Sequence, residues 1–356
     1  MAFRWFHRLG SLVRSFYKLT SGKNHFFIVS FFQAIACVAL PSERPLLRRI
    51  WNVYRSCMVL HYVLCVTRCI MTARSGQSFN AVLNNTHVVF SLTINYLRSL
   101  IIHASFEHFV KVRNFINDRG YRKDEFRSGE IRQKAYEHSI RVTLIFIANI
   151  IFQSITIPIS GMTDTEPFQI PIDLGSLPKV FKKGIEIWYN FSFIPSSYIA
   201  ASNFLSIYLA MIGLRAELRI AHDSISNIPN KVKYLNSIDG KDELFEQKKE
   251  FWIDLHSELK QSIQHHVEVL INLNILKNVT NLSFMLLYYM TMILIAAGVL
   301  IVIFNPVVDV FYVFAIDYTF RYVLECFVFC YTVSSLNATV RILLICHEQI
   351  IENYIP

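Results

Sequence analysis

The charged residues of this chain are gathered into a few segments, and this clustering limits its possible folds more than any other feature. Five stretches of 19 to 31 residues contain no Asp, Glu, Lys or Arg. A helix of about 20 apolar residues can cross a bilayer. Only 17% of the 356 residues are charged, against roughly a quarter in soluble domains. We therefore predict a polytopic membrane protein. The charge-free stretches are residues 24–42, 75–97, 142–163, 187–214 and 278–308.

The predicted fold class is an all-α bundle of membrane helices. A transmembrane β-barrel would need segments of about ten residues with alternating polarity, and the sequence shows none. Two further spans carry charges: in one of them Arg55 and Arg68 lie near the ends, where long side chains reach the headgroups. The six predicted spans are residues 50–71, 79–102, 138–160, 186–212, 281–304 and 307–330.

Basic residues are concentrated in every second segment between these spans. Residues 1–49, 103–137 and 213–280 contain eight, eight and nine Lys or Arg residues, and the other connections contain four in total. The positive-inside rule therefore predicts a cytoplasmic N-terminus. We interpret residues 24–42 as an interfacial or re-entrant helix. If that stretch crossed the membrane, the number of Lys and Arg residues would be 20 on the cytoplasmic side and 9 on the other side, a weaker bias than 25 against 4.

Three charges of the last predicted span are spaced by four residues. Asp317, Arg321 and Glu325 therefore lie on one face of a helix. A charge at bilayer depth is costly unless it is paired or hydrated, so such residues are functional candidates. Their opposite signs allow mutual pairing, and contact with a partner helix or a water-filled path are the alternatives.

Aromatic residues gather in the fourth predicted span around Pro195, which interrupts helical hydrogen bonding. Such a cluster can wall a pocket for a small apolar ligand. A belt of aromatic residues at the membrane interface explains Trp188 and Tyr189 equally well. The cluster comprises Trp188, Tyr189, Phe191, Phe193, Pro195 and Tyr198.

Motifs for metal binding and catalysis are weak. His61, Cys65 and Cys69 follow one another at i,i+4, but no fourth ligand accompanies them, so helix packing is the favoured interpretation. His265 and His266 lie in the mixed-charge segment 213–280, which we interpret as helical extensions of the flanking spans that pack on each other. We interpret the two histidines as part of the solvated face of such a helix. No Gly-rich phosphate loop, His-x-x-x-His pair or Gly-x-Ser-x-Gly elbow occurs. We predict neither an enzyme nor a cofactor.

The arrangement resembles the insect odorant receptor family from about residue 45 to 335. The N-in layout and the long connection between the second and third spans are shared features. Residues 259–270 resemble a family helix with one characteristic histidine, here His266. The stretches that carry the resemblance are Tyr136-Glu137-His138-Ser139, Gly213 to Leu218, Leu259 to Leu270, and Phe329-Cys330-Tyr331 followed by Ser334-Ser335.

This resemblance implies the tuning subunit of a heteromeric, odorant-gated cation channel in the plasma membrane. The expected partners are an odorant co-receptor subunit in a heterotetramer, a small volatile ligand and membrane lipid, without nucleic acid. Aromatic walls suit volatile apolar ligands. The ligand-binding residues carried over by position are His87, Val88, Phe152, Tyr189, Phe193, Tyr198, Phe311 and Tyr312.

One feature departs from the family, in which a seventh span lines the pore. Only 26 residues follow Cys330, and they contain no apolar run of about 20 residues. We therefore expect a chain that keeps the pocket but contributes no pore helix. A gustatory-type receptor or a truncated, non-conducting chemoreceptor is the alternative. A small transporter would require internal repeats, which a comparison of the two halves does not show.

The chain is accordingly divided into five predicted parts. They are a cytoplasmic or interfacial N-terminal segment (1–49), the first four spans with an outer ligand pocket (50–212), a cytosolic helical anchor region (213–280), the last two spans (281–335) and a short C-terminal tail (336–356).

Overall fold

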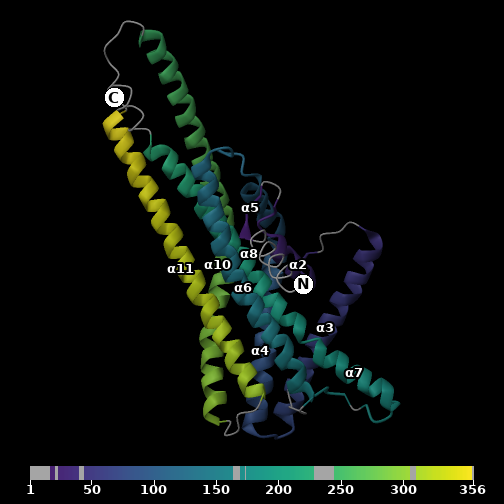
Figure 1. The fold of residues 1–356 in the computed structure, drawn as a ribbon. Coiled ribbons are helices and arrows are strands. Elements are labelled where there is room, and N and C mark those ends of the chain that lie inside the picture. Colours follow the sequence, from purple (N-terminus) through teal and green to yellow (C-terminus); the bar gives the residue numbers. More distant parts are fainter. Residues whose placement is uncertain are drawn as a thin grey trace, which may run out of the picture.

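A computed structural model describes residues 17–20, 23–39, 44–162, 169–172, 174–227, 244–304 and 310–354. Within these ranges the chain is helical and has no strand, which confirms the predicted all-α fold (Figure 1). The helices are α2 (Phe27–Ile35), α3 (Pro45–Arg74), α4 (Phe79–Ala104), α5 (Phe106–Asp118), α6 (Phe126–Met162), α7 (Lys179–Phe191), α8 (Ile194–Ser226), α10 (Leu244–Phe304) and α11 (Val310–Tyr354).

Helix α8 is the centre of the bundle. It contacts α2, α4, α5, α6, α10 and α11, and Figure 1 shows it running between the other long helices. Its many Ala and Ser residues and its one glycine, Gly213, allow neighbouring backbones to approach closely, as is usual between membrane helices. At Gly213 a Cβ atom would lie 2.7 Å from Ile116 Cγ2 of α5, so a larger residue cannot be accommodated without movement.

The described helices agree with the predicted spans. Five of them are long and apolar enough to cross a membrane, and α4 with α5, bent by 70° at Ser105, makes a sixth when the pair is counted as one span. The fourth predicted span is divided between α7 and α8, with Pro195 in the first turn of α8. Helix α11 continues to Tyr354, so the segment predicted as a tail extends the same helix.

The two ends of the bundle differ in their number of Lys and Arg residues. At one end, Tyr121 Oη lies 2.9 Å from Ser224 Oγ and 2.7 Å from Ser262 Oγ, which joins the basic segments 103–137 and 213–280. We call this end the basic end. At the opposite end, Asn80 Nδ2 donates a hydrogen bond of 2.8 Å to the Phe304 carbonyl. The basic segments therefore share one end, as the predicted topology requires.

Helix α2 lies within the predicted interfacial segment 24–42. Its nine residues extend about 14 Å at 1.5 Å per residue, which is too short for a helical crossing. Instead it packs on α8, where Gln33 Nε2 donates to Ser206 Oγ at 2.9 Å and Phe32 contacts the Tyr198 ring at 5.5 Å. Its N-terminal end is tied to α5, because Asn117 Oδ1 accepts from the His25 backbone N–H.

Acidification is expected to weaken the docking of α2 through His25. Burial, with a smaller contribution from the Arg119 charge, lowers the pKa of His25 from 6.5 to about 4. The unfolded chain therefore binds a proton at a higher pH than the folded chain. This contribution to stability is complete above pH 6.5 and is lost as the pH falls toward 4, by at most ~1.4 kcal/mol per pH unit.

The measurement is thermal unfolding of detergent-solubilised protein at pH 7 and pH 5. The wild type is expected to lose more stability between these two values than the His25→Gln variant, which lacks the titrating ring. Equal losses in the two proteins would show that His25 does not carry this pH dependence.

Candidate ligand pocket and buried polar network

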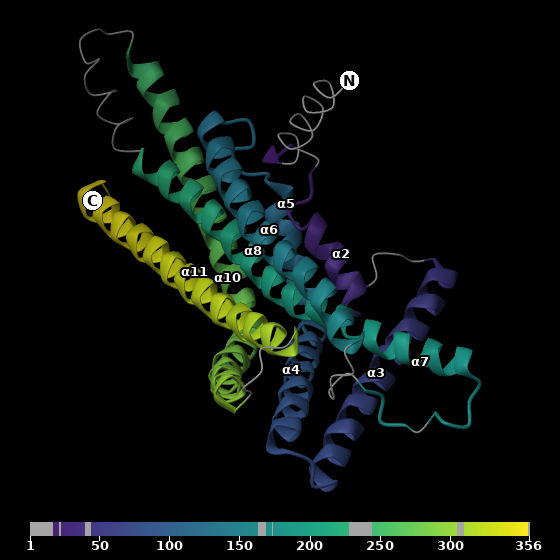
Figure 2. The same cartoon turned by 60° about the horizontal axis from the view of Figure 1, so that its bottom comes forward.

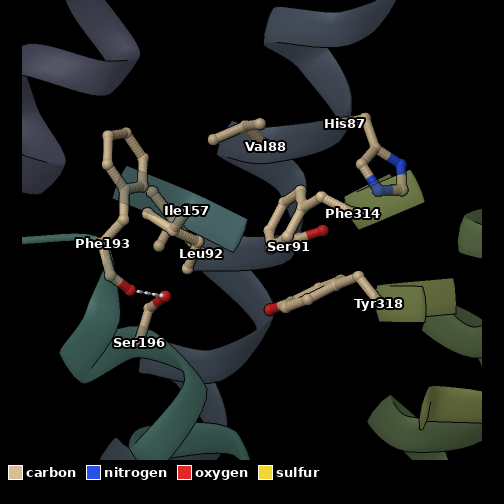
Figure 3. Close-up of a pocket in the computed structure, with 9 residues that line it drawn as sticks. All are labelled: His87, Val88, Ser91, Leu92, Ile157, Phe193, Ser196, Phe314 and Tyr318. Atoms are coloured by element: carbon tan, nitrogen blue, oxygen red, sulfur yellow. Dashed lines mark hydrogen bonds between the residues drawn. The ribbon is translucent and has the colours of Figure 1, made fainter. Parts of the chain in front are cut away.

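A small, mostly apolar cavity lies between α4, α6, α8 and α11 (Figure 3). His87 is eight residues from the start of α4, about 12 Å along the helix axis from the end opposite the basic end. The cavity volume is about 20 Å³, enough for one water molecule. The lining residues are His87, Val88, Ser91, Leu92, Ile157, Phe193, Ser196, Phe314 and Tyr318.

Two polar side chains of α4 face this cavity without a hydrogen bond. Both ring nitrogens of His87 and the hydroxyl of Ser91 are buried and have no hydrogen-bonding partner among the described residues. The His87 ring lies 6.3 Å from the Tyr318 ring, edge to face, and Figure 3 shows both on the same side of the cavity. Buried polar groups are normally hydrogen-bonded, and an unpaired one costs about 1–3 kcal/mol. A ligand with a hydroxyl or carbonyl group would satisfy them.

The predicted ligand-binding residues occupy three different environments. His87, Val88 and Phe193 line the cavity itself. Tyr189, Phe311 and Tyr312 belong to the hydrophobic cluster that surrounds it. The remaining two, Phe152 and Tyr198, lie elsewhere: Phe152 is exposed on α6, and Tyr198 packs near Phe32 of α2.

Several lining residues are absent from the predicted set. Ser91 and Leu92 lie four residues after His87 and Val88, so helical spacing alone would have placed them on the same face. Tyr318 directly follows Asp317, and the sequence pattern of this span indicates its spaced charges rather than its aromatic residues. Ile157 and Ser196 could not have been identified in this way, because their position depends on how α6 and α8 pack against α4.

The intramembrane charges of α11 are paired inside the bundle. Arg98 of α4 donates to Glu325 at 2.8 Å, and both side chains are almost completely buried. Arg321 Nε lies 3.7 Å from Glu325 Oε1, and its guanidinium group lies 4.3 Å from the centre of the Tyr318 ring. One carboxylate thus faces two guanidinium groups. The spacing of these charges allowed mutual pairing, contact with a partner helix or a water-filled path. The observed geometry agrees with mutual pairing.

Asp317 is hydrogen-bonded by two amide side chains of α6. Asn149 Nδ2 and Gln153 Nε2 each donate to its carboxylate at 2.9 Å. Gln153 Oε1 in turn accepts from Arg321 at 3.0 Å. Gln153 therefore bridges an acid and a base of the same helix, and the four charges of this buried polar network (Arg98, Asp317, Arg321 and Glu325) sum to zero when all are ionised.

Tyr318 connects the cavity with this network. Its hydroxyl accepts from Asn95 Nδ2 at 2.6 Å, and Asn95 Oδ1 accepts from Tyr322 at 2.6 Å. The same Tyr318 ring lines the cavity and lies against Arg321. A ligand that displaced Tyr318 would therefore change the surroundings of a buried charge.

The candidate metal ligands of α3 do not converge. His61 Nε2 lies 3.7 Å from Cys65 Sγ, whereas Cys69 Sγ contacts Thr86 of α4 at 3.7 Å. In the described part of the chain, no group of three or more His, Cys, Asp or Glu side chains could hold a metal ion.

A second polar cluster lies at the basic end, and it corrects the interpretation of His265 as part of a solvated face. Its side chain is only 6% exposed and stacks on the Tyr121 ring at 4.2 Å. Its Nε2 lies 3.3 Å from Glu217 Oε2, and Arg132 binds both Glu217 oxygens at 2.8 Å. By contrast, Ile263 and Val267 of the same helix are 40% and 47% exposed.

These features define a multi-pass membrane protein whose interior holds paired charges and a small, mostly apolar cavity. No family model matches the sequence, and no curated protein matches it. The fold is that of an insect olfactory receptor. The structure of olfactory receptor OR5 from Machilis hrabei matches with a TM-score of 0.64 and 13% identity, covering 90% of this chain and 83% of that chain.

A second structure of the same receptor, in complex with eugenol, matches with a TM-score of 0.59 and 12% identity. This match covers 91% of each chain. At this level of identity the likeness establishes the fold.

Proposed function

We propose that this chain is an odorant receptor, the tuning subunit of a heteromeric odorant-gated cation channel in the plasma membrane. The observation that carries the proposal is the cavity between α4, α6, α8 and α11, with mostly apolar walls and two buried polar side chains, His87 and Ser91, that have no hydrogen-bond partner among the described residues. A receptor of the same fold has a structure in complex with eugenol, a volatile phenol. The proposed partner is an odorant co-receptor subunit.

The proposed ligand is a small volatile molecule with one hydroxyl or carbonyl group. Pockets for such ligands usually have volumes of roughly 300–1,000 Å³, whereas this cavity is about 20 Å³. Binding therefore requires side chains to move apart. Phe193 and Tyr318 are the candidates, because their rings form opposite walls in Figure 3. The ligand's polar group would pair with His87 or Ser91.

Movement of Tyr318 is the proposed link between binding and gating. Its ring contacts Arg321, and its hydroxyl contacts Asn95. A ligand that occupies the cavity would shift this ring and so alter the interactions of a buried cation. Because Arg321 and Glu325 lie on α11, the rearrangement would be transmitted along a helix that extends to the basic end.

Odorant-evoked current tests the proposal directly. Cells that express this chain with an odorant co-receptor subunit are exposed to a panel of volatile alcohols, phenols, ketones and their hydrocarbon analogues, with eugenol as the first probe. Surface labelling confirms that the chain reaches the plasma membrane. We expect a cation current for at least one polar volatile. No current from the whole panel, with the chain at the surface, would contradict the assignment as a channel subunit.

Replacement of His87 tests the polar contact. In the His87→Leu variant, the half-maximal concentration of a hydroxyl-bearing ligand is expected to rise about five- to tenfold, the effect of one lost hydrogen bond. The response to its analogue without the hydroxyl is expected to change much less. The matched control is Leu100→Phe, an exposed position on the same helix. An equal rise in the half-maximal concentration of both ligands would show that His87 does not contact the hydroxyl group of the ligand.

A further inference from the structure

A second small cavity lies at the basic end, where the segment that precedes α2 meets the bundle. Helices α2, α5 and α6 all pack against α8, and Figure 2 shows α2 beside α6 and α8. The cavity volume is about 20 Å³, which is enough for one water molecule or one monatomic ion. Four of its lining residues are polar, and the others are apolar or small. The polar ones are His25, Arg119, Arg132 and Glu217.

The ring of His25 reaches this cavity with one nitrogen unpaired. His25 is only 8% exposed, and its Nε2 is buried without a hydrogen-bond partner among the described residues. Asn117 Oδ1 accepts from its backbone N–H at 2.9 Å, and its ring lies 5.4 Å from the Phe26 ring and 5.6 Å from the Tyr136 ring. The ring is therefore held in place. Because buried polar groups are normally hydrogen-bonded, we expect an occupant of the cavity that accepts from Nε2.

The charges that line the cavity do not balance. Arg132 donates to both carboxylate oxygens of Glu217 at 2.8 Å, so these two side chains neutralise each other. Arg119 donates instead to two backbone carbonyls of the segment that precedes α2, at 3.0 and 2.7 Å, and a carbonyl carries no net charge. Two positive charges and one negative charge therefore line the cavity when His25 is neutral. A water molecule would satisfy His25 Nε2 but would leave the excess positive charge in place.

We propose that this cavity binds a monatomic anion, chloride under physiological conditions, between His25, Arg119 and Arg132. A halide ion only accepts hydrogen bonds, so it suits an imidazole N–H and two guanidinium groups. It also brings the net charge of the lining to zero. A phosphate group has five heavy atoms and does not fit a space of this size.

A bound anion would join the segment that precedes α2 to the rest of the bundle. His25 lies in that segment, Arg119 directly follows α5, and Arg132 belongs to α6. The anion would therefore stabilise the docking of α2 on α8. The site is separate from the odorant cavity and does not depend on the proposed function.

Thermal unfolding of the full chain in detergent tests this site, with sodium chloride, sodium bromide and sodium gluconate at equal ionic strength as the probes. Gluconate is too large for the cavity and reports the general effect of salt. We expect chloride and bromide to raise the unfolding temperature of the wild type by about 2–4 °C above its value in gluconate, in a saturable manner.

Two cavity variants and one control make this test specific. His25→Phe and Arg119→Gln are each expected to lose most of the rise. The matched control is Lys111→Gln, which removes an exposed cation of α5 outside the cavity and is expected to keep the full rise. The readout is the difference between salts for one protein, so a lower overall stability of a variant does not affect it.

Bromide also locates the site directly, because its anomalous X-ray scattering distinguishes it from water. Wild-type crystals grown in sodium bromide are expected to show an anomalous peak within hydrogen-bond distance of His25 Nε2. This measurement does not require any variant to fold. The proposal would be overturned by equal rises in the wild type and both cavity variants, by equal unfolding temperatures of the wild type in chloride and gluconate, or by a bromide-grown crystal without an anomalous peak in the cavity.

Discussion

Replacement of Glu217 by Ala is expected to lower the free energy of unfolding by about 3–5 kcal/mol, because it leaves a buried cation without its partner. Glu217 of α8 receives two hydrogen bonds from Arg132 of α6 and lies 3.3 Å from His265 of α10. Both Arg132 and Glu217 are almost completely buried. One carboxylate therefore joins three helices at the basic end.

Thermal unfolding of purified protein measures this effect, with Glu130→Ala as the matched control. Glu130 pairs with Lys134 at 2.6 Å on the same α6 helix, but both side chains are exposed. An exposed pair contributes about 0–1 kcal/mol, so the control is expected to resemble the wild type. A Glu217→Ala protein as stable as the control would show that the cluster does not hold the three helices together.

Replacement of Glu325 by Ala is expected to have an effect at least as large, because Arg98 and Arg321 both lose their counter-charge. Arg321 is only 1% exposed, and its surroundings lie within a predicted membrane span. Removal of one member of a buried pair typically costs about 3–5 kcal/mol, and an unpaired charge inside a bilayer is costly in addition. We expect little folded protein to reach the cell surface.

The surface expression of Glu325→Ala is compared with that of Asp317→Asn, a variant of the same helix for which a smaller loss is expected. Asp317 is held by neutral amides of Asn149 and Gln153 and is only half-buried. An Asn side chain keeps the shape and one acceptor oxygen, so a smaller loss of surface expression is expected. If Asp317→Asn proved more harmful than Glu325→Ala, the pairing described for the network would be wrong.

The sequence predicts the membrane helices well because charge is excluded from the bilayer core. Charge-free stretches locate the apolar parts of α6, α8 and α10 within a few residues of their place in the structure. The 70° bend at Ser105 was not foreseen. A bend between two helices depends on what each of them packs against, and the sequence around Ser105 contains no proline to signal it.

The burial of His265 and the set of residues that line the cavity were harder to predict, because both depend on how the helices pack against one another. His265 lies in a segment with many charges, which predicts a solvated side chain. In the structure its ring stacks on Tyr121, which follows α5, and lies beside Glu217 of α8. Likewise, Ile157 and Ser196 line the cavity only because four helices meet there. Periodicity describes one helix at a time, whereas a site between helices depends on their relative rotation.

Ligand binding to the purified chain tests the central claim most directly, because it requires neither the co-receptor nor conduction. A volatile that binds the folded state raises its unfolding temperature. Eugenol, and then each other volatile of the panel, is added to wild type, to Val88→Phe, which fills the cavity, and to the exposed control Leu100→Phe. We predict a concentration-dependent rise for the wild type and the control, and none for Val88→Phe. An equal rise in all three proteins would place the ligand outside this cavity and contradict the account.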